Sequence, residues 1–260
     1  MRPPSIRLAA ITSRSRCLPS VGTLLHRRSF ASFKPEPISG IPMPYIEETT
    51  PNGRRTWDIF SKLLQERIIC LNGTVDDVMS ASIVAQLLWL ESDTPDKPIT
   101  MYINSGGGSV SSGLAIYDTM NYIKSPVSTI CVGRAASMAA VLLAGGEPGM
   151  RFALQHSYIM IHQPLGGTQG QVSEILIYAN QIQRVRAMFD KILQHHLNKA
   201  KGFEKYSLTD IANMMERDNY LNVQEAIECG VIDSVLTRRE DNKAAQSKQG
   251  DAAPNSPSNA

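Results

Sequence analysis

The strongest constraint on the fold is an alternation of short apolar runs with helical patterns through the middle of the chain. The predicted strands are 68–71, 99–104, 127–133, 152–154, 158–162 and 231–236, and the predicted helices are 75–90, 111–123, 137–144, 207–215 and 223–229. Apolar positions recur at helical spacing in the predicted helices, whereas the strands are short and rich in β-branched residues. Strands and helices that alternate at this spacing indicate an α/β fold, with a mostly parallel sheet covered by helices.

A second constraint is the segment 171–198, which runs for 28 residues without proline or glycine. The pattern predicts one helix that is long for a small domain and very polar toward its end. Such a helix cannot bury its whole length against its own domain. We therefore expect it to project toward a partner.

The two ends differ in composition from the part between them. Residues 1–35 contain six Arg, six Ser and no Asp or Glu, which is typical of an organelle transit peptide, and the 27–32 stretch resembles a matrix-processing site. A basic tail that binds an acidic partner is the alternative. Residues 238–260 lack large apolar side chains and are expected to be disordered. Residues 57–237 are then expected to form one domain, preceded by a segment at 36–56.

Charge and composition exclude several classes of function. The first 35 residues hold seven of the 26 basic side chains, so the rest of the chain carries more acidic than basic groups and is a poor nucleic-acid binder. No window approaches 18 uninterrupted apolar residues, which argues against a membrane span. Cys70 and Cys131 lie in apolar runs, and no Cys/His spacing fits a metal, so we expect reduced core cysteines and no metal site.

A glycine-rich stretch, 104–109, follows one predicted strand and precedes a helix. Glycine allows the backbone to approach a ligand closely and leaves N–H groups free to face an anion. The pattern matches neither GxxxxGK[ST] nor GxGxxG, so it favours an oxyanion hole as readily as a phosphate cradle.

Two further stretches hold candidate catalytic side chains. Ser137 lies between a strand and an apolar helix and is flanked by small residues, so it is either a nucleophile or an ordinary helix cap. His162 ends an apolar strand just before a Pro-Leu-Gly-Gly break; a lone histidine there is more often structural than catalytic, but it is the strongest candidate base among the histidines. His195 and His196 lie on the polar end of the long helix and are expected on the solvated surface.

A serine nucleophile needs a base and an orienting acid. Local patterns leave five acids open: Asp190, Asp210, Glu216, Asp218 and Asp233.

Taken together, these stretches resemble the ClpP family, the proteolytic subunits of Clp proteases, in their mitochondrial form. The similarity runs from about residue 41 to residue 237 and is carried by 102–105 (Tyr-Ile-Asn-Ser), 116–120 (Ile-Tyr-Asp-Thr-Met), 135–138 (Ala-Ala-Ser-Met), 160–167 (Met-Ile-His-Gln-Pro-Leu-Gly-Gly), 216–218 (Glu-Arg-Asp) and 230–233 (Gly-Val-Ile-Asp). Two departures stand out. Gly106 takes the place of the family's usual proline, and the 197–207 segment is several residues longer than in bacterial members.

The resemblance implies roles for individual residues. Ser137 would be the nucleophile, His162 the general base and Asp218 the acid that orients it, with the backbone N–H groups of Gly108 and Met138 as the oxyanion hole. The implied fold is the ClpP or crotonase-like α/β fold with a projecting handle, a long helix and a strand, at about 164–198. Residues 36–56 correspond to the axial-loop segment.

The resemblance also implies an assembly and a location. ClpP subunits form heptameric rings, and two stacked rings enclose a chamber, so the expected particle is a tetradecamer in the mitochondrial matrix. A AAA+ unfoldase of the ClpX type would feed in unfolded proteins and would use the ATP, so this chain needs no cofactor. Tyr102 and Tyr122 match the pocket that receives the unfoldase loops. Two alternatives stay open: a crotonase-type acyl-CoA enzyme and a catalytically silent ring subunit.

Overall fold

Seven strands form the main sheet of the computed structural model, which describes residues 44–50 and 53–237, all within the unit Gly40–Ala260. The strands are β3 (Ile68–Asn72), β4 (Ile99–Ser105), β5 (Val127–Ala136), β6 (Arg151–Leu154), β7 (Tyr158–Ile161), β8 (Asn219–Asn222) and β9 (Ser234–Leu236). The order is β3-β4-β5-β6-β9, and β7 pairs with the end of β5 and with β8. Every pairing is parallel except β7 with β8.

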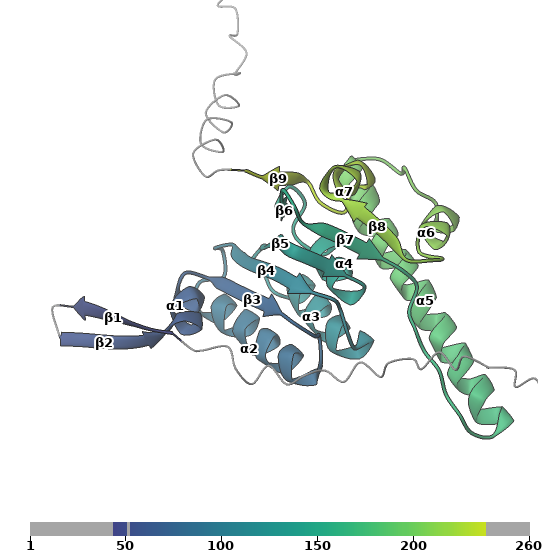
Figure 1. Cartoon of the computed structure of the whole chain (residues 1–260), viewed down its shortest axis with the longest axis horizontal. Coiled ribbons are helices and arrows are strands. Elements are labelled where there is room, and N and C mark those ends of the chain that lie inside the picture. Colours follow the sequence, from purple (N-terminus) through teal and green to yellow (C-terminus); the bar gives the residue numbers. More distant parts are fainter. Residues whose placement is uncertain (1–43, 51–52, 238–260) are drawn as a thin grey trace, which may run out of the picture. The chain divides into compact units, whose positions relative to one another are not determined.

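Helices cover this sheet. They are α1 (Ile59–Gln65), α2 (Asp77–Asp93), α3 (Val110–Tyr122), α4 (Met138–Ala144), α5 (Val172–Lys201), α6 (Leu208–Met214) and α7 (Val223–Cys229). Helices α2 and α3 lie side by side along the sheet (Figure 1), and each begins at a residue whose side chain accepts a backbone hydrogen bond, Asp76 and Ser109 respectively. All seven residues of α4 are buried. Among the helices of the described part, none is long and apolar enough to cross a membrane.

The predicted α/β fold with a mostly parallel sheet is confirmed. Alternate residues of β4 (Ile99, Met101 and Ile103) are fully buried, which is the pattern of a strand with one face on the core. Four elements were not predicted: α1, β8, and the strands β1 (Tyr45–Thr50) and β2 (Gly53–Asp58), which form a hairpin. The predicted transit peptide at 1–35 and the predicted tail at 238–260 lie outside the described residues, as does much of the 36–56 segment.

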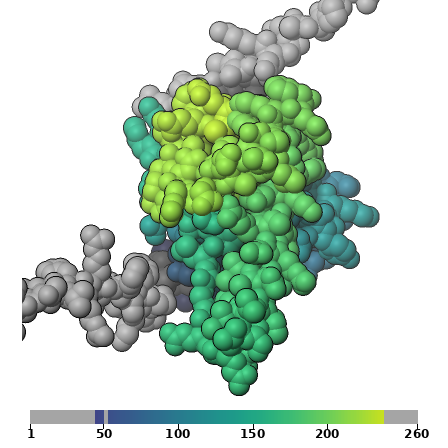
Figure 2. Space-filling view, turned by 90° about the vertical axis from the view of Figure 1, so that its right-hand side faces the viewer, coloured from purple at the N-terminus to yellow at the C-terminus, as the bar shows by residue number. Residues whose placement is uncertain are grey.

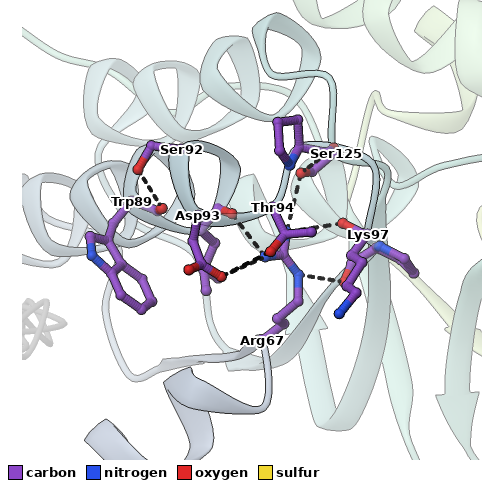
Figure 3. Close-up of polar contacts among 10 residues, drawn as sticks. Arg67, Trp89, Ser92, Asp93, Thr94, Lys97 and Ser125 are labelled. Carbon is purple, nitrogen blue, oxygen red and sulfur yellow. Dashed lines mark hydrogen bonds and ion pairs between the residues drawn. The ribbon is translucent and has the colours of Figure 1, made fainter.

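The guanidinium of Arg67 joins the start of β3 to two loops (Figure 3). It donates hydrogen bonds to the carbonyl oxygens of Leu90, Lys97 and Pro98 and to the hydroxyl of Ser125. Because the last carbonyls of a helix have no partner within it, this cation stabilises the C-terminal end of α2. These contacts lie at the N-terminal ends of β3 and β4, whereas the glycine-rich stretch 104–109 lies at the C-terminal end of β4.

The long helix α5 continues the 171–198 prediction by three residues and ends at Gly202 in the left-handed conformation. Its N-terminal half and the segment 163–171 extend away from the sheet (Figures 1 and 2). The handle was predicted to contain a strand, but within the described part of the chain the 163–171 segment pairs with no strand. It packs on α5 instead, since a methyl group added to Gly166 would lie 2.6 Å from Cδ1 of Ile182.

One sequence-based expectation is wrong. His196 was expected on the solvated surface, but only 4% of it is exposed, whereas its neighbour His195 is exposed. The C-terminal half of α5 packs back onto the body and carries His196 with it. Its Nε2 atom lies 2.7 Å from the hydroxyl oxygen of Tyr117 on α3, and the two rings meet edge to face. Burial, followed by the nearby positive groups, lowers the pKa of His196 to about 4.

Candidate active site

Ser137 forms the sharp turn between β5 and α4. Its backbone has φ 56° and ψ −125°, a conformation that L-residues rarely adopt. The side chain makes no capping hydrogen bond to α4. Its Oγ atom lies 2.8 Å from Nε2 of His162. The alternative of an ordinary helix cap is therefore wrong, and the turn exposes the hydroxyl to a second side chain.

The strand pairing aligns His162 with Asp218. In the antiparallel pair of β7 and β8, Ile161 lies opposite Asn219, so the next position on each side places His162 opposite Asp218. Oδ1 of Asp218 lies 3.2 Å from Nδ1 of His162. One imidazole nitrogen thus contacts the serine hydroxyl, and the other contacts the carboxylate. Its side chain is 10% exposed, whereas that of Asp218 is 59% exposed.

The other four candidate acids lie elsewhere. Asp233 forms a buried ion pair with Arg151, Asp210 caps α6 through Ser207, Glu216 pairs with Arg186, and Asp190 is buried in α5. Burial raises the pKa of Asp190, and its Oδ1 atom has no hydrogen-bond partner among the described residues. The structure therefore brings one of the five acids, Asp218, to His162.

The glycine-rich stretch packs directly against this serine. A methyl group added to Gly107, which has φ 89°, would lie 2.8 Å from Cβ of Ser137, and one added to Gly108 would lie 2.2 Å from the carbonyl oxygen of Val75. Only glycine fits at either position. The loop is held by hydrogen bonds from Val75 N to Gly107 O (2.9 Å) and from Ser109 N to Val75 O (2.7 Å). The N–H groups of Gly108 and Met138 have no acceptor in the described part of the chain.

A pocket of about 280 Å³ opens beside these groups. It is lined by Ser137, His162, Gly108 and Met138 and by apolar side chains from helices α3, α4 and α5, from strand β7 and from loops. The apolar part consists of Val110, Val141, Met160, Ile161, Pro164, Leu165, Phe189, Leu193 and Met215. The pocket therefore combines a reactive polar edge with an apolar interior, as in sites that hold one apolar group of a substrate.

Further contacts hold the segment before Asp218, and they include Arg186, which the sequence did not single out. The backbone N–H of Gln163 donates to Met215 O (2.7 Å), and its side chain donates to Glu216 O (2.8 Å). The Glu216 carboxylate accepts a hydrogen bond from Arg186 on α5 (2.7 Å). These contacts tie the residue after His162, and the helix α5, to the segment that carries the acid.

The two tyrosines that were assigned to unfoldase docking lie on different elements. Tyr102 is half-buried on β4, between Cys70 of β3 and Ile130 of β5. Tyr122 is 80% exposed at the C-terminal end of α3. The docking role of both tyrosines stays a prediction.

A sequence model of the Clp protease family matches residues 51–239, which is most of the chain. The chain belongs to the Clp protease family. Its mostly parallel α/β sheet and helices are consistent with the ClpP fold, and it is a ClpP-type peptidase. Members of this family generally assemble into rings with an unfoldase partner. The match favours a peptidase over the alternative of an acyl-CoA enzyme.

Proposed function

We propose that this chain is a serine endopeptidase in which Ser137 is the nucleophile, His162 the general base and Asp218 the acid that orients the base. The observation that carries the proposal is the shared imidazole, with Nε2 2.8 Å from the serine Oγ and Nδ1 3.2 Å from the carboxylate. A serine hydroxyl is a weak nucleophile unless a neighbouring base accepts its proton. The arrangement supplies that base and fixes its orientation.

The proposed reaction follows from these positions. Oγ of Ser137 attacks the scissile carbonyl carbon as its proton passes to Nε2 of His162. The Asp218 carboxylate stabilises the imidazolium that forms and holds the ring in the correct tautomer. The imidazolium then gives the proton to the leaving amine, which releases one product and leaves an acyl-enzyme. A water molecule, deprotonated by the same imidazole, hydrolyses the ester and restores the serine.

The N–H groups of Gly108 and Met138 are proposed to bind the oxyanion of the tetrahedral intermediates. Both residues line the pocket that holds Ser137, and neither N–H has an acceptor in the described part. Met138 is also the first residue of α4, and the N-terminal end of a helix favours negative charge. Donors that are already in place need no rearrangement as charge develops on the substrate oxygen.

The apolar interior of the pocket supports a preference for a large apolar side chain next to the scissile bond. Val141, Phe189, Leu193 and Met215 would surround that side chain. Burying a leucine or methionine side chain contributes about 1.5–3 kcal/mol. The proposed substrates are unfolded proteins, which expose such side chains and can lie in the site in extended form.

We further propose the assembly and location that the ClpP family suggests. Two stacked heptameric rings would enclose the active sites, and an unfoldase of the ClpX type would bind at Tyr102 and Tyr122 and supply the ATP-driven step. The apolar side chains exposed on the N-terminal half of α5 support an interface there, at the proposed handle of residues 164–198. The composition of residues 1–35 supports import into the mitochondrial matrix.

Labelling with a fluorophosphonate tests the proposal, because this probe reacts with activated serines. We expect the label on Ser137 in the purified protein, and no label after Ser137→Ala. Peptide hydrolysis should fall by about 10⁴–10⁶-fold in that variant. Ser82→Ala is the matched control, since Ser82 is exposed on α2, and this variant should stay labelled and active.

The same experiment separates the proposal from a catalytically silent ring subunit. A silent subunit would neither take up the label nor hydrolyse peptides, although its rings would assemble. Activity above a few per cent in correctly assembled Ser137→Ala protein would also contradict the assignment.

A further inference from the structure

Arg134 on β5 is a cation without a partner close to the proposed active site. Its side chain is exposed, and it makes no hydrogen bond or ion pair with any residue in the described part of the chain. Arg67, Arg151 and Arg186, by contrast, each bind a carboxylate or several carbonyl groups. The guanidinium of Arg134 therefore keeps all its donors available to another molecule.

The guanidinium of Arg134 lies next to Gly106. A methyl group added to Gly106 would lie 3.5 Å from Nη2, 3.6 Å from Cζ and 3.9 Å from Nε of Arg134. These three atoms lie at similar distances, so the flat guanidinium rests against the glycine. Because residue 106 has no side chain, the cation can lie directly on the backbone of the glycine-rich stretch.

This contact places Arg134 near the reacting atoms. Gly106 lines the proposed substrate pocket, and the next residue, Gly107, packs against Ser137. Consecutive Cα atoms are about 3.8 Å apart. An extended substrate advances by about 3.3 Å per residue. The guanidinium is thus within reach of substrate side chains about one to three residues from the scissile bond.

Arg134 is a charged side chain that contacts the lining of the pocket, at Gly106. No lysine, arginine, aspartate or glutamate lines the pocket itself. Asp218 lies behind the imidazole, where its carboxylate faces Nδ1 of His162. A guanidinium forms paired hydrogen bonds with a carboxylate, and it repels a lysine or arginine side chain.

From these contacts we propose that Arg134 is a specificity-determining residue that favours substrates with an acidic side chain close to the scissile bond. The inference rests on the proposed serine peptidase function and adds a second element to its specificity. The pocket selects an apolar side chain, and Arg134 selects a carboxylate at a neighbouring position of the same substrate.

Internally quenched peptides test this on the full assembled protein. The peptides share one leucine for the pocket, next to the cleaved bond, and carry Glu, Gln or Lys in turn at the five other positions within three residues of that bond. At one or two adjacent positions we expect kcat/KM for the Glu peptide to exceed that for the Gln peptide by about three- to fivefold, the effect of a partly solvated ion pair. The Lys peptide should be slower than both, and the Glu:Lys ratio should shrink at high salt.

Substitution of Arg134 decides whether this residue is the cause. The Glu:Lys ratio should collapse in Arg134→Gln and be partly kept in Arg134→Lys, which has the charge but not the planar fork. Arg184→Gln, on the exposed part of α5, should keep the wild-type ratio. Because each ratio compares peptides on one enzyme preparation, a loss of active protein does not change it.

Two outcomes would overturn the inference. One is a wild-type protein with no preference for Glu at any of the five varied positions, and the other is an Arg134→Gln variant that keeps the wild-type ratio. If the fluorophosphonate still labels Ser137 in these proteins, the inference fails alone and the proposed function stands. If wild-type protein takes up no label and cleaves no peptide, both fail.

Discussion

The two halves of α5 belong to one unbroken helix but meet different surroundings. From Val172 to Gln181 every side chain is exposed, including the large apolar Leu176 and Ile177. From Phe189 onward the helix buries Phe189, Asp190, Leu193, His196 and Leu197 against the body. The exposed half also carries apolar side chains that a solvated helix does not need, and Figure 2 shows this region extending from the rest of the described residues.

This contrast separates two sources of stability. The C-terminal half gains its stability from the core of its own subunit, where apolar side chains leave water on folding. The N-terminal half gains none there, and its apolar side chains become buried only if another subunit covers them. The C-terminal half therefore folds as part of its own subunit, whereas burial of the N-terminal half depends on the proposed assembly.

The largest difference in stability between the two halves is expected between two separate variants, Leu197→Ala and Ile177→Ala. Leu197 is fully buried, so its truncation should lower the free energy of unfolding by about 2–5 kcal/mol at any protein concentration. Ile177 is 70% exposed, so its truncation should matter only where subunits associate. Denaturant unfolding over a range of protein concentrations measures both. A concentration-independent loss of similar size in Ile177→Ala would contradict the comparison.

The buried histidine predicts a pH-dependent stability for the C-terminal half. The pKa of His196 is about 4 in the folded chain and about 6.5 when unfolded, so between these values the unfolded state binds a proton that the folded state does not. Stability should therefore be unaffected by this group above pH 6.5 and be lost as the pH falls toward 4, by about 3 kcal/mol in total.

Unfolding curves at several pH values measure this loss. In His196→Gln the slope between pH 6.5 and pH 4 should be smaller than in wild type, because the titrating group is gone. His195→Gln is the matched control, since His195 is the exposed neighbour, and it should keep the wild-type slope. Equal slopes in all three proteins would show that His196 does not carry the effect.

The smallest effect is expected at Arg186, which lies between the two halves and pairs with Glu216 near Asp218. Both side chains are partly exposed, so Arg186→Gln should cost about 0.2–1 kcal/mol, seen as a fall in kcat of less than about fivefold. Arg186→Lys should restore most of the rate, and Arg184→Gln should leave it unchanged. A loss with Arg186→Gln that Lys does not restore would point to packing rather than to the charge.

The sequence predicts the layers of this fold better than the details of its site. Apolar periodicity places most strands and helices because it reflects which face is buried. Strand β8 was missed because Asn219–Asn222 is short and polar at both ends, yet this strand is what brings Asp218 to His162. Local patterns could not choose among five acids for the same reason. The polarity of the helix misplaced His196, because burial in the C-terminal half is decided by the elements packed against it, α4 and α6 with Tyr117 of α3, and not by the sequence of α5 itself.

The antiparallel register of β7 and β8 has a consequence for how such a chain can evolve. In topological terms, residues 162–218 are the loop of a hairpin, and the whole of α5 and α6 is an elaboration of that loop. Lengthening a loop of this size adds little closure entropy, since each doubling costs only about 0.6 kcal/mol. The length of the segment 197–207, predicted to exceed that of bacterial members, therefore does not affect the position of His162 opposite Asp218. Residues within the loop can be added or replaced while the β7–β8 pairing keeps these two side chains opposite each other.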